Sequence, residues 1–302
     1  MPMATDVAII IPTFNDSERL RLCLRALAQQ TYPQAAFCVY VVDNNSSEDI
    51  ESIVNEYPFA HYLYEQKPGS YVARNTAIAA LKNEQWIAFT DADCIPAKNW
   101  IEAGVNALQA SQVDAVGGAV NVSFEDKNHP TTVELYEAIR GFPQRDYIKQ
   151  NQFAVTANLW VERAVMDDVG GFNAALFSGG DLEWGNRLHA AQYRMVFDER
   201  VAVAHPARTK LSQLTRKIRR TAGGSFSQRH QTKTSAKLFS WPELLRGMIP
   251  PVTMLTQFSK LARPLSVLQK TSVFALATYL KWYQTAVRLG YKLGLIRGFE
   301  RL

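Results

Sequence analysis

Three aspartates follow short apolar runs in the first third of the chain, where strand-like segments end in turn-forming residues. Asp43 follows 37–42, and Asp91 and Asp93 follow 86–89. Three carboxylates in one crevice repel one another and raise one another's pKa unless a cation or hydrogen-bond donors compensate. Oxygen ligands of this kind suit a divalent metal ion. The other explanation is that aspartate is common in turns, and it weakens when all three residues end strands.

Two more carboxylates, Asp181 and Glu183, stand at the start of a segment with helical spacing, 182–191. Gly179 and Gly180 precede them, so capping of this helix is one explanation of Asp181. Glu183 falls in the first turn, where a negative charge complements the helix dipole. The pattern predicts a helix that begins at these residues.

The aspartates lie in a stretch that alternates short β-branched runs with helical patterns, which is typical of βαβ units and a parallel sheet. Strands are predicted at 7–11, 37–42, 61–64, 86–89 and 115–120. In an open parallel sheet, the loops at the carboxyl ends of the strands converge on one crevice that binds ligands. Asp43, Asp91 and Asp93 all belong to such loops.

Two local patterns refine this outline. Asn15 followed by Glu18 predicts a capping box and a helix through about Gln30. Gly117 and Gly118 interrupt a predicted strand, and they indicate that another group approaches its backbone closely.

The chain has 302 residues, of which 47% are hydrophobic and 20% are charged. Its charges are distributed unevenly between two regions. The composition is that of a chain that buries a core, and it excludes a disordered or collagen-like protein. Residues 1–205 carry 15 Lys and Arg against 26 Asp and Glu, a net of −11. Residues 206–302 carry 18 against 2, a net of +16. Such asymmetry predicts two different roles.

The three cysteines, Cys23, Cys38 and Cys94, have no paired spacing, which excludes a disulfide framework and favours a reducing compartment. No basic segment precedes the apolar run 7–11, which is also too short for a signal sequence. Charged residues interrupt the apolar stretches near the C-terminus, so no run reaches the roughly 18 residues of a membrane-spanning helix. We expect a cytoplasmic protein that does not cross a membrane.

Seven ordered motifs resemble those of a known enzyme family. They read Val-Ala-Ile-Ile-Ile-Pro-Thr-Phe-Asn at 7–15, Val-Val-Asp-Asn-Asn-Ser at 41–46, Lys-Pro-Gly-Ser-Tyr-Val-Ala-Arg-Asn at 67–75, Thr-Asp-Ala-Asp at 90–93, Gly-Gly-Phe-Asn at 170–173, Gly-Gly-Asp-Leu-Glu-Trp-Gly-Asn-Arg-Leu at 179–188 and Val-Ala-His at 203–205. Each alone is weak, whereas the ordered set is specific. Over about residues 5–220 the chain resembles a family-2 glycosyltransferase. The resemblance implies the α/β fold named GT-A, a Rossmann-like, mostly parallel sheet flanked by helices, here with a basic helical C-terminal extension.

The resemblance also implies a nucleotide-sugar donor. Pro12 and Phe14 would line the nucleotide pocket. Asp43 would accept a hydrogen bond from the base, which favours the ring N–H of uracil and therefore a UDP-sugar. Arg74 would lie near the phosphates, and Asp91 would face the ribose.

A divalent metal, Mn²⁺ or Mg²⁺, is implied as well, because the leaving diphosphate needs fixed positive charge. Asp93 would bind this metal. His205 would add an imidazole ligand that favours Mn²⁺, unless it merely ends a strand. Asp181 would be the general base that deprotonates the acceptor hydroxyl in a single inverting displacement. The family commonly has an acidic residue just before the base, whereas this chain has Gly180, so Glu183 is the second candidate.

Three further side chains are candidates for the diphosphate and the acceptor. Trp184 would either stack on an acceptor sugar or pack in the core. Arg216 and Arg219 would supply counter-charge near the diphosphate, unless they belong to a solvated basic helix. Some processive family members have a Gln-x-x-Arg-Trp motif here, but Lys217 replaces the tryptophan, so we infer no processivity.

The segment 265–293 has a mostly apolar helical pattern. At 100° per residue, Lys270, Lys281, Arg288 and Lys292 fall in one narrow stripe. Such a helix is typical of an anionic membrane interface. Packing on the catalytic domain, or on a second subunit in a homo-oligomer, explains the pattern as well.

These observations predict a catalytic domain at 1–220 and a basic helical tail at 221–302. The domain would comprise a nucleotide-sugar half at about 1–120, an acceptor half at about 121–205 and a basic segment at 206–220. The acceptor would be a saccharide or a lipid-linked hydroxyl. Binding of the tail to lipid would hold the protein peripherally on the cytoplasmic face of a membrane.

Rival functions fit less well. A nucleotidyltransferase needs a glycine-rich phosphate loop with a basic residue after the first strand, which 12–15 lacks. A nucleic-acid-binding protein is disfavoured because the basic region has no recognisable nucleic-acid module. An inactive scaffold is disfavoured because the aspartates and His205 are all retained.

Overall fold

The computed structural model describes residues 5–111, 113–230, 233–261 and 264–296. The chain forms two compact units. The sheet unit comprises residues 1–121 and 142–205, and the helical unit comprises 122–141 and 206–302. This division differs from the predicted boundary at 220, because helix α9 (Leu211–Ser227) runs through that position.

The sheet unit is built on one eight-stranded sheet in the order β3-β2-β1-β4-β7-β6-β8-β5. Its strands are β1 Val7–Thr13, β2 Phe37–Asp43, β3 Ala60–Tyr64, β4 Trp86–Thr90, β5 Ile95–Pro96, β6 Ala115–Ser123, β7 Asn158–Glu162 and β8 Met195–Pro206. β1 pairs in parallel with β2 and β4, and β2 pairs in parallel with β3. The pairs β4–β7, β6–β7 and β5–β8 are antiparallel. The predicted α/β class is confirmed, and its parallel part is the N-terminal half.

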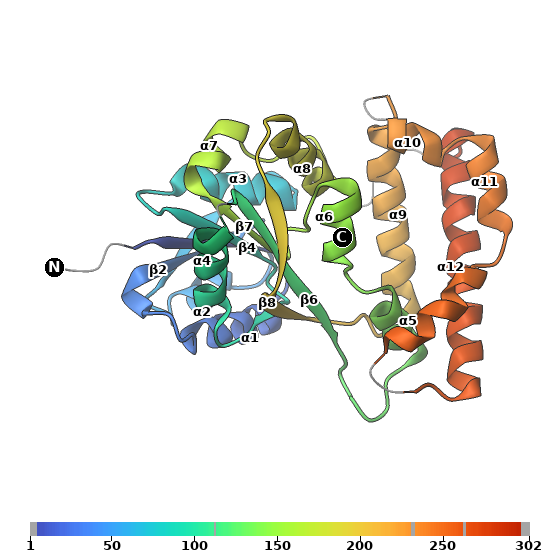
Figure 1. Ribbon diagram of the computed structural model, residues 1–302, viewed down its shortest axis with the longest axis horizontal. Helices are drawn as coiled ribbons and strands as arrows, with labels where there is room; N and C mark the ends of the chain where they lie inside the picture. Colours follow the sequence, from blue (N-terminus) through green and yellow to red (C-terminus); the bar gives the residue numbers. More distant parts are fainter. Residues whose placement is uncertain (1–4, 112, 231–232, 262–263, 297–302) are drawn as a thin grey trace. The chain divides into compact units, whose positions relative to one another are not determined.

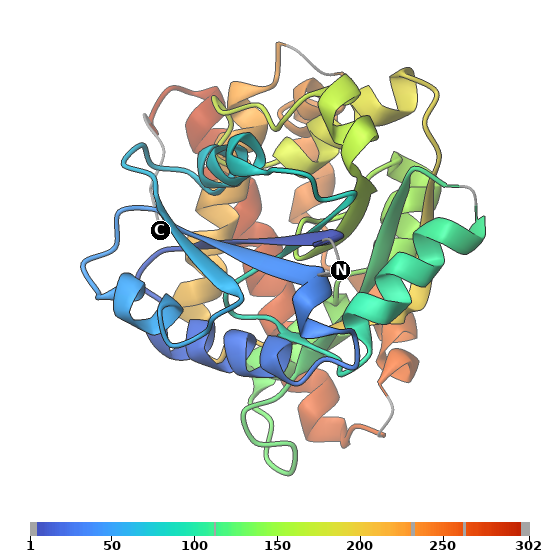
Figure 2. The ribbon, with the colours of Figure 1, turned by 90° about the vertical axis from the view of Figure 1, so that its left-hand side faces the viewer.

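Helices cover both faces of this sheet, as Figure 1 and Figure 2 show. One face packs on α1 Ser17–Ala28, α2 Ile50–Val54 and α4 Trp100–Ser111, and the other on α3 Ser70–Ala80, α7 Arg163–Val169 and α8 Gly180–Ala190. The unit also contains α6 Gln144–Asn151 and a 3₁₀ turn at Gln34–Ala36. Strand β1 explains the layering: Ile9 and Ile11 join the first core and Ala8 and Ile10 the second, because successive side chains point to opposite faces.

Tertiary contacts correct one local prediction and confirm another. Asn15 does not cap α1, which begins at Ser17, and instead has a φ of +49°. Gly118 does make room for a close approach, but the approaching groups belong to the chain's own core. A Cβ at this position would lie 2.2 Å from the Val201 carbonyl oxygen and 2.3 Å from Asn158 Nδ2.

The helical unit packs around its longest helix. It contains α5 Thr132–Arg140, α9, α10 Lys233–Leu238, α11 Trp241–Met248, a 3₁₀ segment η2 at Val252–Lys260 and α12 Val267–Lys292 (Figure 1). Val273 and Ala277 of α12 pack with Leu135 and Ile139 of α5. The apolar side of α12 is therefore largely buried within its own unit.

The cationic stripe predicted for this helix is not one exposed surface. Lys292 Nζ donates to the Phe239 carbonyl oxygen at 2.8 Å, and Arg288 is half-buried. Lys270 remains exposed near the beginning of the helix. In the part of the chain that the structure describes, no helix is long and apolar enough to span a membrane.

Candidate active site

Hydrogen bonds connect the loops that follow β1 and β2, and a further hydrogen bond fixes the side chain of Asp43. The Asn15 backbone N–H donates to Ser46 Oγ at 2.9 Å, and Asn15 Oδ1 accepts from the Ser47 backbone N–H at 2.7 Å. Asp43 Oδ1 accepts from the Ser46 N–H at 2.8 Å. The left-handed backbone conformation of Asn15 therefore accompanies the contact between the two loops, and Asn15 does not cap a helix.

Asp43 is buried at the carboxyl end of β2, with 4% of its surface exposed. Its Oδ2 accepts from the Tyr62 hydroxyl at 3.1 Å. Thr13 lies opposite Asp43 in the register of β1 and β2, and its buried hydroxyl has no hydrogen-bond partner within the described residues. Pro12 is buried in β1 and Phe14 is half-buried in the following loop. A buried hydroxyl without a partner is the kind of group that a bound ligand satisfies.

Arg74 of α3 is buried and contacts the partly exposed Asp91, which follows β4. Arg74 is 3% exposed, and its Nη2 donates to Asp91 Oδ1 at 2.5 Å. Nη1 donates to the Ser70 carbonyl oxygen, and the Nε–H has no partner among the described groups. The predicted phosphate and ribose residues are therefore neighbours, with one buried donor still available.

The two predicted metal ligands, Asp93 and His205, are brought together by the pairing of β5 with β8. Ile95 pairs with Ala204, which carries the next residue of β8, His205, to the start of β5. His205 Nε2 lies 3.5 Å from Asp93 Oδ2. His205 is 7% exposed, and its ring lies 4.9 Å from that of Phe142. Donor atoms of Asp93, Cys94 and His205 all lie within 4.8 Å of one another.

This donor set fits a hard divalent cation bound by one carboxylate and one imidazole, with further positions open to ligand oxygens. Cys94 is the third group, but a hard divalent cation prefers oxygen ligands to a soft thiolate. Asp93 and His205 are thus the side chains here that would hold a metal.

Asp181 lies in the first turn of α8 and does not cap it. Gly179 is the residue before the helix, in the left-handed region with a φ of 82°. The Asp181 carboxylate accepts from Thr156 Oγ1 at 3.2 Å, and its backbone N–H donates to the Tyr71 hydroxyl at 3.4 Å. The carboxylate is therefore held by tertiary contacts, which the capping explanation does not require.

Burial raises the pKa of the half-buried Asp181 above its ordinary value. Arg74 and the hydrogen bonds of Tyr71 and Thr156 oppose the rise, whereas the charge of Asp91 adds to it. A carboxylate with a raised pKa is a stronger base than a solvated one. The charges that act on Asp181 are those of the residues predicted to face the donor.

Glu183 and Trp184 have structural partners. Glu183 accepts two hydrogen bonds from Arg187, at 2.7 and 3.1 Å, and Arg187 also donates to the carbonyl oxygens of Val169 and Gly171. Trp184 is 1% exposed and donates its indole N–H to the Gly170 carbonyl oxygen at 2.9 Å. Of the two alternatives for Trp184, the structure supports packing in the core rather than stacking on an acceptor sugar.

Arg216 and Arg219 belong to α9 of the helical unit. Arg216 is exposed, and Arg219 donates from Nε to the Tyr283 hydroxyl at 2.5 Å. Their role toward a diphosphate stays a prediction.

Three residues that contact the site were not predicted from the sequence: Thr13, Tyr71 and Thr156. Only Tyr71 had a usable signal, because it stands one helical turn before Arg74 and therefore on the same side of α3.

Known proteins match both the sequence and the architecture of this chain. Residues 8–174 match the model of the family "Glycosyl transferase family 2". The chain belongs to this family. It is therefore a glycosyltransferase of the GT-A fold.

Two curated relatives carry related names. Glycosyltransferase AglE of Haloferax volcanii is 37% identical over 67% of this chain and 67% of its own length. The pre-mycofactocin glycosyltransferase of Mycobacterium tuberculosis is 28% identical over 82% of this chain, and the match spans 53% of the relative.

Solved structures of low sequence identity share the fold. Mannosyltransferase PcManGT from Pyrobaculum calidifontis, in complex with GDP-Man and Mn²⁺, superposes with a TM-score of 0.65 at 17% identity. The match covers 95% of this chain and 87% of PcManGT. S. aureus TarS 1-349 in complex with UDP gives a TM-score of 0.54 at 15% identity, over 98% of this chain and 94% of TarS.

Proposed function

We propose that this glycosyltransferase moves a sugar from a UDP-sugar to a hydroxyl acceptor in one inverting, metal-assisted displacement with Asp181 as the general base. The observation that carries the proposal is the gathering of five groups at the carboxyl edge of the sheet: Asp43, the Arg74–Asp91 contact, and the Asp93–His205 pair. Ligands of open α/β sheets bind at this edge.

The properties of Asp181 support its role as the general base of an inverting mechanism. Its raised pKa suits the removal of a proton from an acceptor hydroxyl, and Thr156 and Tyr71 hold its position. Glu183 is the weaker candidate, because both of its oxygens accept from Arg187. Asp181 would take the acceptor proton as the hydroxyl oxygen attacks the anomeric carbon and the diphosphate leaves.

Asp93 and His205 would hold the divalent metal. When bound, the metal supplies the positive charge that a leaving diphosphate requires. The imidazole of His205 favours Mn²⁺ over Mg²⁺, since Mg²⁺ prefers oxygen ligands. Arg74 would add a fixed positive charge of its own, with its Nε–H free to donate to a phosphate oxygen.

Asp43 supports uridine as the base of the donor. Each of its two oxygens already accepts one hydrogen bond, from Ser46 and from Tyr62. Each oxygen keeps a further lone pair, so the carboxylate can still accept the ring N–H of uracil. The two structural neighbours bear on both uridine and guanosine, because PcManGT was solved with GDP-Man and TarS with UDP.

A saccharide or lipid-linked hydroxyl is the proposed acceptor. The support is the charge of residues 206–302, with 18 Lys and Arg against 2 Asp and Glu, which suits an acceptor that carries phosphate.

Binding of UDP and GDP to the full chain, measured by titration calorimetry with MnCl₂, tests the donor and the metal together. We expect UDP to bind at least about tenfold more tightly than GDP, and EDTA to weaken the binding of UDP. Equal affinity, or a preference for GDP, would contradict a UDP-sugar donor.

A further inference from the structure

Exposed apolar side chains are concentrated in the helical unit. Thirteen of the seventeen large apolar side chains that are exposed in the described residues lie there. Eight of the thirteen belong to the segment 241–268, and we call them the apolar rim: Trp241, Leu245, Met248, Ile249, Val252, Leu255, Val267 and Leu268. Leu245, Val267 and Leu268 are 68%, 78% and 76% exposed. A concentration of this kind marks an interaction surface rather than ordinary scatter.

Contacts along α12 place the rim segment in order. Lys292 Nζ lies 5.0 Å from the centre of the Trp241 ring, and Trp282 Nε1 donates to the Met248 carbonyl oxygen at 2.8 Å. Leu255 and Phe274 then line one pocket. The segment therefore runs beside α12 from its C-terminal to its N-terminal part.

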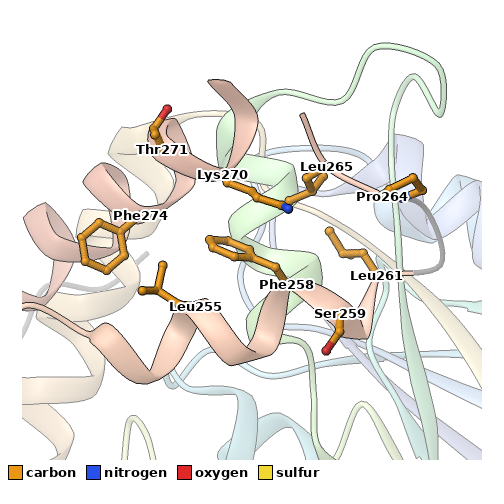
Figure 3. Close-up of a pocket in the computed structure, with 9 residues that line it drawn as sticks. All are labelled: Leu255, Phe258, Ser259, Leu261, Pro264, Leu265, Lys270, Thr271 and Phe274. Carbon is orange, nitrogen blue, oxygen red and sulfur yellow. The ribbon is translucent and has the colours of Figure 1, made fainter. Parts of the chain in front are cut away.

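A pocket of about 790 Å³ opens among these residues, within the helical unit alone. It is lined by Leu255, Phe258, Ser259, Leu261, Pro264, Leu265, Lys270, Thr271 and Phe274 (Figure 3). This volume is within the range of roughly 300–1,000 Å³ of small-molecule sites. Six of the nine lining residues are apolar, so the pocket suits an apolar ligand.

Two of the three polar side chains of the pocket form hydrogen bonds within the chain, and the third, Lys270, is its charged group. Ser259 Oγ donates to the Thr256 carbonyl oxygen, and Thr271 Oγ1 donates to carbonyl oxygens of its own helix. Figure 3 shows the Lys270 side chain extending over Phe258 toward Leu265. Within the described residues, Lys270 forms no ion pair with a carboxylate. An apolar pocket with one free ammonium group suits an apolar chain with an anionic head.

We propose that this pocket takes one acyl chain of an anionic phospholipid, with Lys270 at the lipid phosphate and the apolar rim in the lipid–water interface of a bilayer. A soluble ligand would fill the pocket but leave the rim in water, whereas a bilayer covers both. The charge of residues 206–302 complements anionic lipid. The same charge disfavours a second copy of this chain as the partner, since two such surfaces repel.

This membrane contact lies mostly on other residues than the one that the pattern of 265–293 predicts. The apolar side of α12 is used for packing, and the exposed groups come from α11, η2 and the beginning of α12. Binding to lipid is independent of the proposed donor, so it is measured without any nucleotide.

Co-sedimentation of the full chain with vesicles tests the proposal. We expect binding to vesicles of phosphatidylcholine with about 30% phosphatidylglycerol, binding at least about tenfold weaker to pure phosphatidylcholine, and a decrease with salt. Leu255→Glu should weaken binding to the anionic vesicles at least about tenfold, because it places a charge at the mouth of the pocket. Its matched control is Leu22→Glu, a residue of α1 in the sheet unit that is 48% exposed against 54% for Leu255.

Lys270→Gln should weaken binding to anionic vesicles about fivefold and leave binding to neutral vesicles unchanged. Lys82→Gln, at an exposed position of the sheet unit, is its control. If Leu255→Glu fails to fold, the double variant Val267→Ser with Leu268→Ser replaces it, because both side chains are more than three quarters exposed.

Three results would overturn the proposal. They are no binding to anionic vesicles, equal binding of Leu255→Glu and Leu22→Glu, and a dimer in sedimentation velocity that Leu255→Glu abolishes while vesicles remain unbound. The last result would assign the rim to a second copy of the chain. None of them bears on sugar transfer, which is measured without vesicles.

Discussion

Replacement of Asp181 by asparagine separates its proposed role as a base from a structural role. The amide has almost the same size as the carboxylate, and its oxygen can still accept from Thr156, 3.2 Å away in the wild-type structure. It cannot accept a proton from an acceptor hydroxyl. The variant should therefore keep its fold and its affinity for UDP while losing turnover.

The expected loss follows from the chemistry of the group. General base catalysis contributes about 10²–10⁴ to a rate, so kcat of Asp181→Asn should fall by this factor. UDP release from the sugar donor measures kcat, and calorimetry measures the affinity for UDP. Asp146→Asn, an exposed position on α6, is the matched control and should retain wild-type turnover.

The raised pKa of Asp181 also predicts how the ionisation of its carboxylate affects the stability of the fold. The folded chain holds this proton more tightly than the unfolded chain does, so the stability difference is present at low pH and is lost as the pH rises through the raised pKa. At neutral pH the ionised carboxylate therefore destabilises the fold, and Asp181→Asn should have a Tm equal to or above that of the wild type. For the same reason, wild-type turnover should fall as the pH drops through this pKa.

Two outcomes would refute the reasoning about Asp181. Wild-type turnover of Asp181→Asn would show that another group accepts the proton. A parallel loss of UDP binding and Tm would show that the carboxylate is structural.

Two further substitutions test the metal pair and the core beneath the site. His205→Ala should raise the Mn²⁺ concentration for half-maximal turnover at least about tenfold, because it removes one of the two proposed side-chain ligands, and an unchanged metal titration would exclude His205 as a ligand. Gly118→Ala should lower stability by about 1–3 kcal/mol, or the Tm by roughly 3–10 °C, because its Cβ would lie 2.2 Å from the Val201 carbonyl oxygen. A Tm within 1 °C of the wild type would contradict this packing.

Local sequence signals located the parallel half of the sheet and its aspartates. Apolar runs bounded by turn residues predict strands, and parallel strands carry their terminal loops to one edge, so Asp43, Asp91 and Asp93 followed from spacing alone. His205 and Asp181 needed the resemblance to a family, because antiparallel pairing and the placement of α8 depend on contacts distant in sequence.

What the sequence left undetermined depends on tertiary contacts. Asn15 has the pattern of a helix cap, but its side chain bonds to Ser47, 32 residues away. Trp184 directly follows a candidate base in the sequence, but its ring is buried in the core. The cations of 265–293 share one face of an ideal helix, but Arg288 and Lys292 are taken up by packing within the helical unit.

Release of UDP by the full chain from a panel of UDP-sugars, with Mn²⁺ and with EDTA, tests whether the chain is a metal-assisted transferase that uses a UDP-sugar. We expect that at least one donor releases UDP with Mn²⁺, that EDTA abolishes the release, and that Asp93→Asn abolishes it as well. Metal-independent release, or no release from any UDP-sugar while GDP-sugars turn over, would contradict the proposed metal site or the proposed donor.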